Sequence, residues 1–109
     1  MIRSVRTAVI IILSLSFSAI VSAQSSGDAI FIFKCASCHG KDGAGKTSFA
    51  QKFPIPDLHS QYVQSQTDRD LFGSIGKGYG HKQYPHAFLL RGMTEAELYA
   101  LIRYIRTMK

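Results

Sequence analysis

The clearest pattern of hydrophobic and polar positions lies at the end of the chain. Thr94 and Glu97 have the spacing of a capping box, which begins a helix. After this cap, apolar residues recur at intervals of three and four: Leu98, Leu101, Ile102, Ile105 and Met108. These positions share one helical face, so the pattern predicts an amphipathic helix at the C-terminus.

Two shorter helices are expected earlier in the chain. Segment 27–34 is mostly apolar and is predicted to be a short helix. A second helix is expected to begin at Thr67 or Asp68 and to stop at Gly76. Its apolar positions have helical spacing: Leu71, Phe72 and Ile75. No convincing strand-like alternation occurs, so the expected fold class is all-α.

The segments that connect these helices, 40–66 and 76–92, are long. Prolines at 54 and 56 prevent a regular helix in the first, and glycines interrupt the second. Connections of this length usually have a function of their own. A domain this small also buries only a marginal apolar core. Loops that enclose a large apolar cofactor would explain both features.

Residues 1–23 are predicted to be a secretory signal peptide. Two arginines precede an uncharged apolar run at 8–21, and Ala23 ends a stretch of small residues suited to signal peptidase. The run is too short and serine-rich for a convincing membrane span, which needs about 20 apolar residues. We expect a periplasmic domain at 24–109 with no membrane span after cleavage; an uncleaved anchor is the alternative.

The candidate chemistry lies in the segment Cys35-Ala36-Ser37-Cys38-His39, which holds the only two cysteines of the chain. The C-x-x-C-H pattern is typical of covalent attachment of a c-type haem. Two thiols at this spacing reach the two vinyl groups on one edge of the porphyrin, and His39 then binds the iron. We therefore expect one haem c per chain.

Other uses of the two cysteines fit less well. A disulfide would close a loop too short to stabilise the fold much. A thioredoxin-like redox pair would lie near a βαβ pattern, which this chain lacks. A zinc site would need two more ligands from His59, His81 or His86, at no recognised spacing.

With these residues, segment 24–109 resembles the small single-haem class I cytochromes c. Gly27, Phe31 and Cys35 match the G-x3-F-x3-C pattern that leads into the haem motif of that family. Segment 94–108 looks like the family's C-terminal helix, with Tyr104 in its aromatic position. The resemblance implies a cytochrome c-like fold of about three short helices with long loops wrapped around the haem.

The resemblance also implies two roles for single residues. Gly27 would permit close approach of the first and last helices. Pro56, followed by Asp57-Leu58, looks like the proline of the family's haem loop. Its carbonyl would accept the Nδ1–H of His39, which fixes the tautomer of the ligand and raises its basicity. An ordinary loop proline is the alternative for Pro56.

The second axial ligand of the iron departs from the family pattern. The family's usual M-P-x-F segment is missing. Counting back from Thr94 by the family's spacing reaches His86, which we expect to be the sixth ligand. Alignment on the neighbouring proline gives Tyr84 instead. Met93 is the next candidate after His86, His81 is another, and an open or water-bound site is the remaining alternative.

The function predicted from these features is electron transfer, with the iron cycling between Fe(II) and Fe(III). We expect no enzymatic activity. Ligation by His86 would give a lower potential than ligation by methionine. One alternative is a haem-based binder or sensor of small ligands, with a weak or absent sixth ligand. Another is the haem subunit of a larger oxidoreductase.

The balance of charges bears on the partners. The chain carries 13 Lys and Arg against 7 Asp and Glu. We expect redox partner proteins with acidic surfaces, and Lys46, Lys77 and Lys82 are candidates for a basic docking rim. The cationic residues are scattered and the chain is expected to be exported, so nucleic acid is not an expected partner. The domain is expected to be a monomer or a subunit of a respiratory complex.

Overall fold

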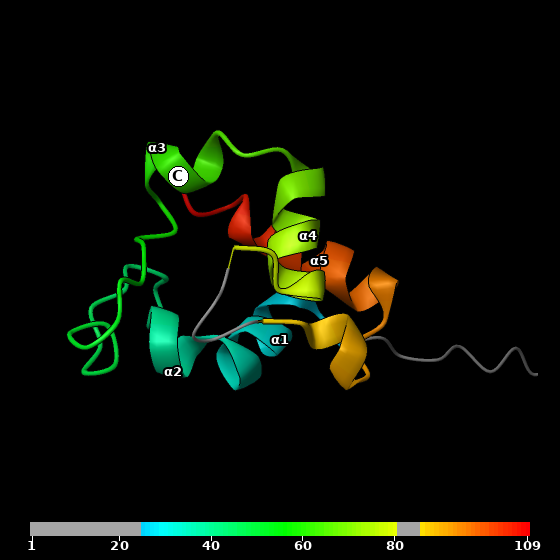
Figure 1. Cartoon of the computed structure of the whole chain (residues 1–109), viewed down its shortest axis with the longest axis horizontal. Helices are drawn as coiled ribbons and strands as arrows, with labels where there is room; N and C mark the ends of the chain where they lie inside the picture. Colours follow the sequence, from blue (N-terminus) through cyan, green and yellow to red (C-terminus); the bar gives the residue numbers. More distant parts are fainter. Residues whose placement is uncertain (1–24, 81–85) are drawn as a thin grey trace, which may run out of the picture.

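The computed structural model describes residues 25–80 and 86–109, which form one helical body (Figure 1). The predicted signal segment 1–23 lies outside these ranges. Within them the chain has helices and no strands, which confirms the expected all-α class. In the described ranges, no helix has the length and apolar character to cross a membrane. The elements are α1 (Gly27–Lys34), α2 (Ala36–His39), α3 (Gln61–Gln64), α4 (Asp68–Lys77), the 3₁₀-helix η1 (Phe88–Arg91) and α5 (Glu95–Ile105).

The three predicted helices are all present. Helix α1 has the predicted bounds. Helix α4 is capped by Thr67 and ends one residue beyond the predicted stop, because Gly78, in the left-handed conformation with φ 76°, caps its C-terminus. Helix α5 begins after Thr94 with both hydrogen bonds of the capping box. It ends at Ile105, before the last residue of the predicted apolar stripe.

Three short elements were not among the predicted helices. Helix α2 contains the haem motif after Cys35, which is its N-cap. Helix α3 lies within the predicted loop 40–66, and η1 lies within the predicted loop 76–92. Each is only four residues long, so none has room for the repeated apolar spacing that identifies a helix.

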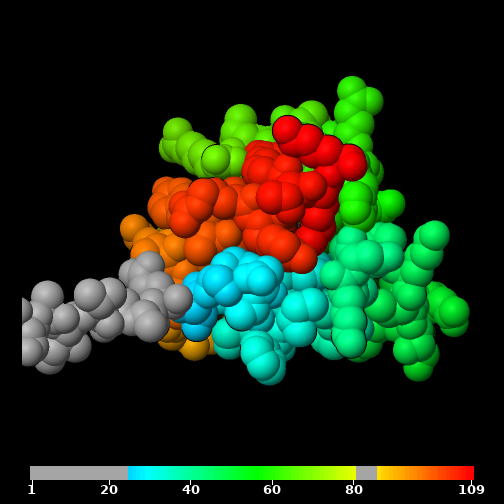
Figure 2. Space-filling view, turned by 180° about the vertical axis from the view of Figure 1, so that it is seen from behind, coloured from blue at the N-terminus to red at the C-terminus, as the bar shows by residue number. Residues whose placement is uncertain are grey.

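Helix α5 is the centre of the core. It packs against α1 and α4, and Figure 2 shows α5 lying along α1 on the rear face of the molecule. All members of the predicted apolar stripe are buried, with 7% or less of each exposed: Leu98, Leu101, Ile102, Ile105 and Met108. The stripe prediction is therefore confirmed, although Met108 lies just beyond the helix.

The predicted close approach of the first and last helices occurs at Gly27. A Cβ atom at this position would lie 2.2 Å from the carbonyl oxygen of Ala100 on α5. One turn further along α1, the rings of Phe31 and Tyr104 meet with centroids 5.5 Å apart. This contact places the end of α1, and so the haem motif, at a defined position relative to α5.

The capping box of α4 predicts a dependence of stability on acid pH. The Thr67 hydroxyl donates to the Asp70 carboxylate at 2.7 Å, and the Thr67 backbone N–H also donates to it, at 3.1 Å. These bonds hold the pKa of Asp70 below its usual value. Because the pKa is lower in the folded state, the stabilisation is complete above the unfolded value of about 3.9 and is lost as pH falls through the folded value.

We therefore expect the Asp70→Asn variant to lose less thermal stability than the wild type as pH falls from about 4 to the folded pKa of Asp70. The unfolding midpoint, followed by circular dichroism from pH 7 to pH 2, measures this change. Thr67→Ala is the matched variant and should flatten the same part of the profile, since it removes the hydroxyl that donates to the Asp70 carboxylate. If the unfolding midpoints of both variants fall below pH 4 as steeply as that of the wild type, this role of the capping box is contradicted.

Candidate functional site

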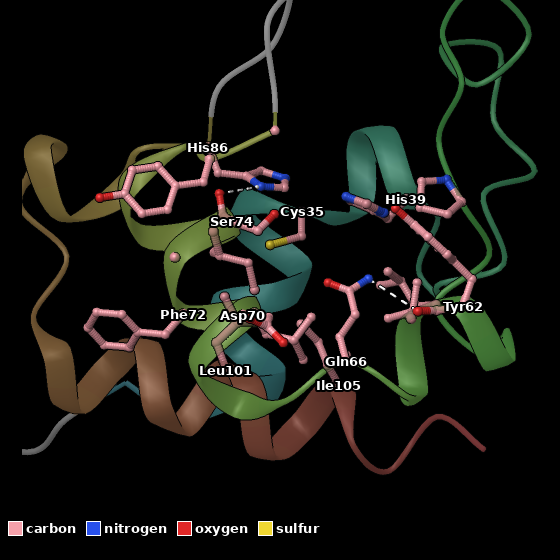
Figure 3. Close-up of a pocket in the computed structure, with 18 of the residues that line it drawn as sticks. Cys35, His39, Tyr62, Gln66, Asp70, Phe72, Ser74, His86, Leu101 and Ile105 are labelled. Atoms are coloured by element: carbon pink, nitrogen blue, oxygen red, sulfur yellow. Dashed lines mark hydrogen bonds between the residues drawn. The ribbon is translucent and has the colours of Figure 1, made fainter.

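A cavity of about 1080 Å³ lies between α1, α4, α5 and the loop that follows α2 (Figure 3). This volume is at the upper limit of the range of about 300–1,000 Å³ typical of ligand and cofactor sites. The cavity is lined largely by apolar side chains, including Phe31, Leu58, Val63, Leu71, Ile75, Leu101 and Ile105. It therefore fits a large apolar group. Among the residues predicted from the sequence, Cys35, His39, Pro56 and His86 line it.

The haem motif forms a single helical turn. Cys35 ends α1, and its N–H donates to the Phe31 carbonyl at 2.9 Å. The His39 N–H donates to the Cys35 carbonyl at 2.9 Å, and Gly40, with φ 82°, ends the turn. One turn of helix therefore holds both thiols and the imidazole of His39, as the C-x-x-C-H motif requires for thioethers on one porphyrin edge and a ligand below it.

The two cysteines are half-buried, and no disulfide joins them. Burial raises the pKa of the Cys35 thiol to about 12, and the neighbouring Cys38 adds to the increase. The Cys35 side chain is therefore neutral at physiological pH. This state suits a thiol that lines an apolar cavity and does not suit a reactive thiolate of a redox disulfide.

The imidazoles of His39 and His86 lie opposite each other at the cavity, with ring centroids 6.0 Å apart and ring planes 29° apart. With about 2 Å from a metal to each nitrogen and about 1 Å from each nitrogen to its ring centre, two imidazoles on opposite sides of one metal ion have centroids about 6 Å apart. The observed separation therefore fits a pair of axial ligands.

The ring of His86 is held from α4. Its Nδ1 lies 3.2 Å from the Ser74 carbonyl oxygen (Figure 3). A carbonyl only accepts, so Nδ1 carries the proton and Nε2 is the nitrogen with the lone pair. Metal-binding histidines usually donate their second ring N–H in this way, which fixes the tautomer. His86 therefore has the hydrogen bond expected of a ligand.

The loop after the motif brings Pro56 to the same cavity. The Gly45 N–H donates to the His39 carbonyl at 2.7 Å, and a Cβ at Gly45 would lie 3.4 Å from the Pro56 carbonyl oxygen. The Thr47 hydroxyl donates to the Cys38 carbonyl at 2.7 Å. These contacts hold the loop against the haem motif. The bond from His39 Nδ1 to the Pro56 carbonyl stays a prediction.

The other candidate ligands have different positions. Met93 is buried, with 7% exposed, and is not among the described residues that line the cavity. His59 lies at the surface, with its Nδ1 2.7 Å from the Asp57 carboxylate. His81, Tyr84 and the rim candidate Lys82 fall outside the described ranges. Within residues 25–80 and 86–109, no three His, Cys, Asp or Glu side chains are grouped to hold a metal ion, so these ranges offer no zinc site.

Part of the cavity wall was not predicted. Polar residues from α3, α4 and the segments that flank α4 line it: Tyr62, Gln66, Arg69, Asp70 and Tyr79. The rim candidate Lys77 also lines the cavity. Gln66, Arg69 and Asp70 fall at intervals of three and four, which is the spacing of one helical face. That spacing was the available signal. It could not be separated from an ordinary solvent-exposed helical face.

Comparison with known proteins agrees with this geometry. A family model described as Cytochrome c matches residues 24–109, which is most of the chain. No curated protein and no solved structure gives a significant match. The matched residues include the C-x-x-C-H turn, the cavity and all described helices. The chain therefore belongs to the cytochrome c family, a family of haem c electron-transfer proteins, and carries a covalently bound haem c with iron.

Proposed function

We propose that this protein is a periplasmic electron carrier whose haem has two histidine ligands. Cys35 and Cys38 would form the thioethers, and His39 and His86 would bind the iron. When bound, the haem supplies one-electron chemistry by cycling between Fe(III) and Fe(II). The observation that carries the proposal is the separation of 6.0 Å between the two ring centroids in one cavity.

The chain's own residues support a carrier in three ways. Apolar side chains such as Phe31 and Leu101 keep water from the site. The Ser74 carbonyl holds one tautomer of His86. Tyr62 and Tyr79 line the cavity and are also 73% and 65% exposed, so the cavity reaches the surface there. An electron therefore has a short route to a partner at this edge.

A basic partner-binding rim at this edge is part of the proposal. The Lys77 ammonium lies 5.8 Å from the centre of the Tyr79 ring, and both residues line the cavity. Lys46 is exposed on the loop after the haem motif. These cations favour a redox partner with an acidic surface, because complementary charge speeds association.

His86→Ala tests the proposed sixth ligand. We expect the ferric spectrum to lose its low-spin bis-histidine form, and carbon monoxide to bind the reduced protein at least about tenfold faster, since no ligand must first dissociate. Visible spectra of both redox states and flash or stopped-flow mixing with carbon monoxide measure these changes. Met93→Leu and His59→Ala are matched controls and should keep the wild-type spectrum.

Two results would contradict the proposed ligation by His86. An unchanged spectrum in His86→Ala would remove His86 as the ligand. A near-infrared thioether–iron band in the oxidised wild-type protein, lost in Met93→Leu, would assign the site to Met93. Rapid binding of carbon monoxide to the wild-type reduced protein at neutral pH would favour the ligand-sensing alternative. Fixed co-purification with a larger oxidoreductase would instead favour a subunit role.

A further inference from the structure

We propose that Arg91 is a positioning residue that holds His86 on the iron and so sets the strength of the sixth-ligand bond. This inference rests on the proposed ligation by His86. It concerns a residue outside the cavity: Arg91 is exposed, ends η1 and is not among the described residues that line the site.

Arg91 contacts the His86 segment in two ways at once. Its Nη2 donates to the backbone carbonyl of His86 at 2.9 Å. Its guanidinium carbon lies 4.4 Å from the centre of the Phe88 ring. A planar guanidinium can stack on an aromatic ring while its N–H groups donate at the edge, which a lysine cannot reproduce. The side chain therefore bridges the backbone of His86 and the ring that follows it.

Phe88 continues this arrangement to the ligand ring. The rings of His86 and Phe88 lie with centroids 5.9 Å apart and planes 21° apart. Phe88 therefore contacts both the guanidinium of Arg91 and the ring of His86. Motion of the imidazole away from His39 would disturb its contact with the ring of Phe88.

The backbone between these residues is turned tightly. Ala87 has φ 45° and ψ 34°, a left-handed conformation that is unfavourable for a non-glycine residue. Such a conformation persists only where surrounding contacts hold it. The hydrogen bond from Arg91 to the residue before Ala87 closes this turn, and the Leu90 N–H donates to the Ala87 carbonyl at 3.0 Å.

The turn is fixed to the core at its other end. The Met93 N–H donates to the Phe88 carbonyl at 3.0 Å, and Met93 is buried directly before the cap of α5. Helix η1 also packs on α4, where a Cβ at Gly76 would lie 2.9 Å from Leu89. Arg91 therefore connects the His86 backbone to η1, which is fixed to the core through Met93 and α4.

The test compares carbon monoxide binding to the reduced holoprotein in five variants and the wild type. Binding requires His86 to leave the iron, so the rate reports how firmly the ligand is held. We expect Arg91→Ala to bind about tenfold faster than wild type, because a hydrogen bond from a charged donor is lost at a partly solvated site. Arg91→Lys should fall between the two. Arg103→Ala, an exposed arginine on α5, is the matched control and should equal wild type.

His86→Ala, alone and combined with Arg91→Ala, separates the possible outcomes. The inference requires that Arg91→Ala has no further effect once His86 is gone. A persisting effect would mean a general opening of the cavity and would overturn it. A wild-type rate in Arg91→Ala, with fast binding in His86→Ala, would overturn the role of Arg91 alone. A wild-type rate in His86→Ala would overturn the proposed ligation and this inference together. The thermal midpoint of Arg91→Ala should stay near that of wild type.

Discussion

Replacing both Cys35 and Cys38 by alanine is expected to release the haem and leave the chain largely unfolded. Without thioethers the cofactor is held only by its axial ligands and by apolar contact. Its loss would leave a cavity of about 1080 Å³ inside a domain of residues 24–109. Core residues such as Leu101 and Ile105 line that cavity and would lose their contacts with the haem.

The size of this effect follows from the small size of the domain. Domains have a net stability of only about 5–15 kcal/mol. Full burial of one Leu or Ile side chain contributes about 1.5–3 kcal/mol. Loss of the apolar contacts between the haem and several cavity-lining side chains is therefore enough to remove most of the stability. Each single variant, Cys35→Ala or Cys38→Ala, keeps one possible thioether and should retain part of the haem.

Haem staining after denaturing electrophoresis and far-ultraviolet circular dichroism measure the two parts of this prediction. Ser37→Ala is the matched control, since Ser37 lies between the thiols and is exposed. It should keep both the covalent haem and the helical signal. Haem that still migrates with the double variant under denaturing conditions would show that these cysteines are not the attachment points.

The features that could be predicted from the sequence are those with dense local signals. Helix α5 combines a capping box with a stripe over three turns, and each signal alone indicates a helix. Thr67 and Asp70 similarly mark the start of α4. The C-x-x-C-H motif is local as well, because its chemistry needs a thiol pair and an imidazole within one turn.

The features that could not be predicted depend on contacts between distant segments or on backbone strain. Helix α3 has only four residues, one of them buried, and so lacks any period. The left-handed turn at Ala87 has no sequence signal, because alanine rarely adopts that conformation. The anchor of His86 is the carbonyl of Ser74, a group that every residue carries. Spacing alone singled out His86, but only the fold brings its ring opposite His39.

Gly27→Ala is expected to be the most destabilising single substitution outside the haem motif. The added Cβ would lie 2.2 Å from the carbonyl oxygen and 2.8 Å from the carbonyl carbon of Ala100. Both are backbone atoms of α5, so no side chain can turn aside and the two helices must separate. Overpacking of a core costs about 1–3 kcal/mol and occasionally more. We expect a cost of about 3 kcal/mol here, because the displaced helix pair also positions Cys35.

Gly73→Ala provides the matched control on α4. A Cβ there would lie 2.9 Å from the ring of Tyr79, an exposed side chain that can move. Alanine is also about 1 kcal/mol better than glycine inside a helix. This variant should therefore be neutral or more stable, whereas Gly27→Ala should lower the thermal midpoint of the holoprotein by about 10–20 °C. Equal midpoints for the two variants would contradict the close crossing of α1 and α5. A lower midpoint that leaves the haem spectrum unchanged would show that the crossing stabilises the fold without setting the geometry of the iron ligands.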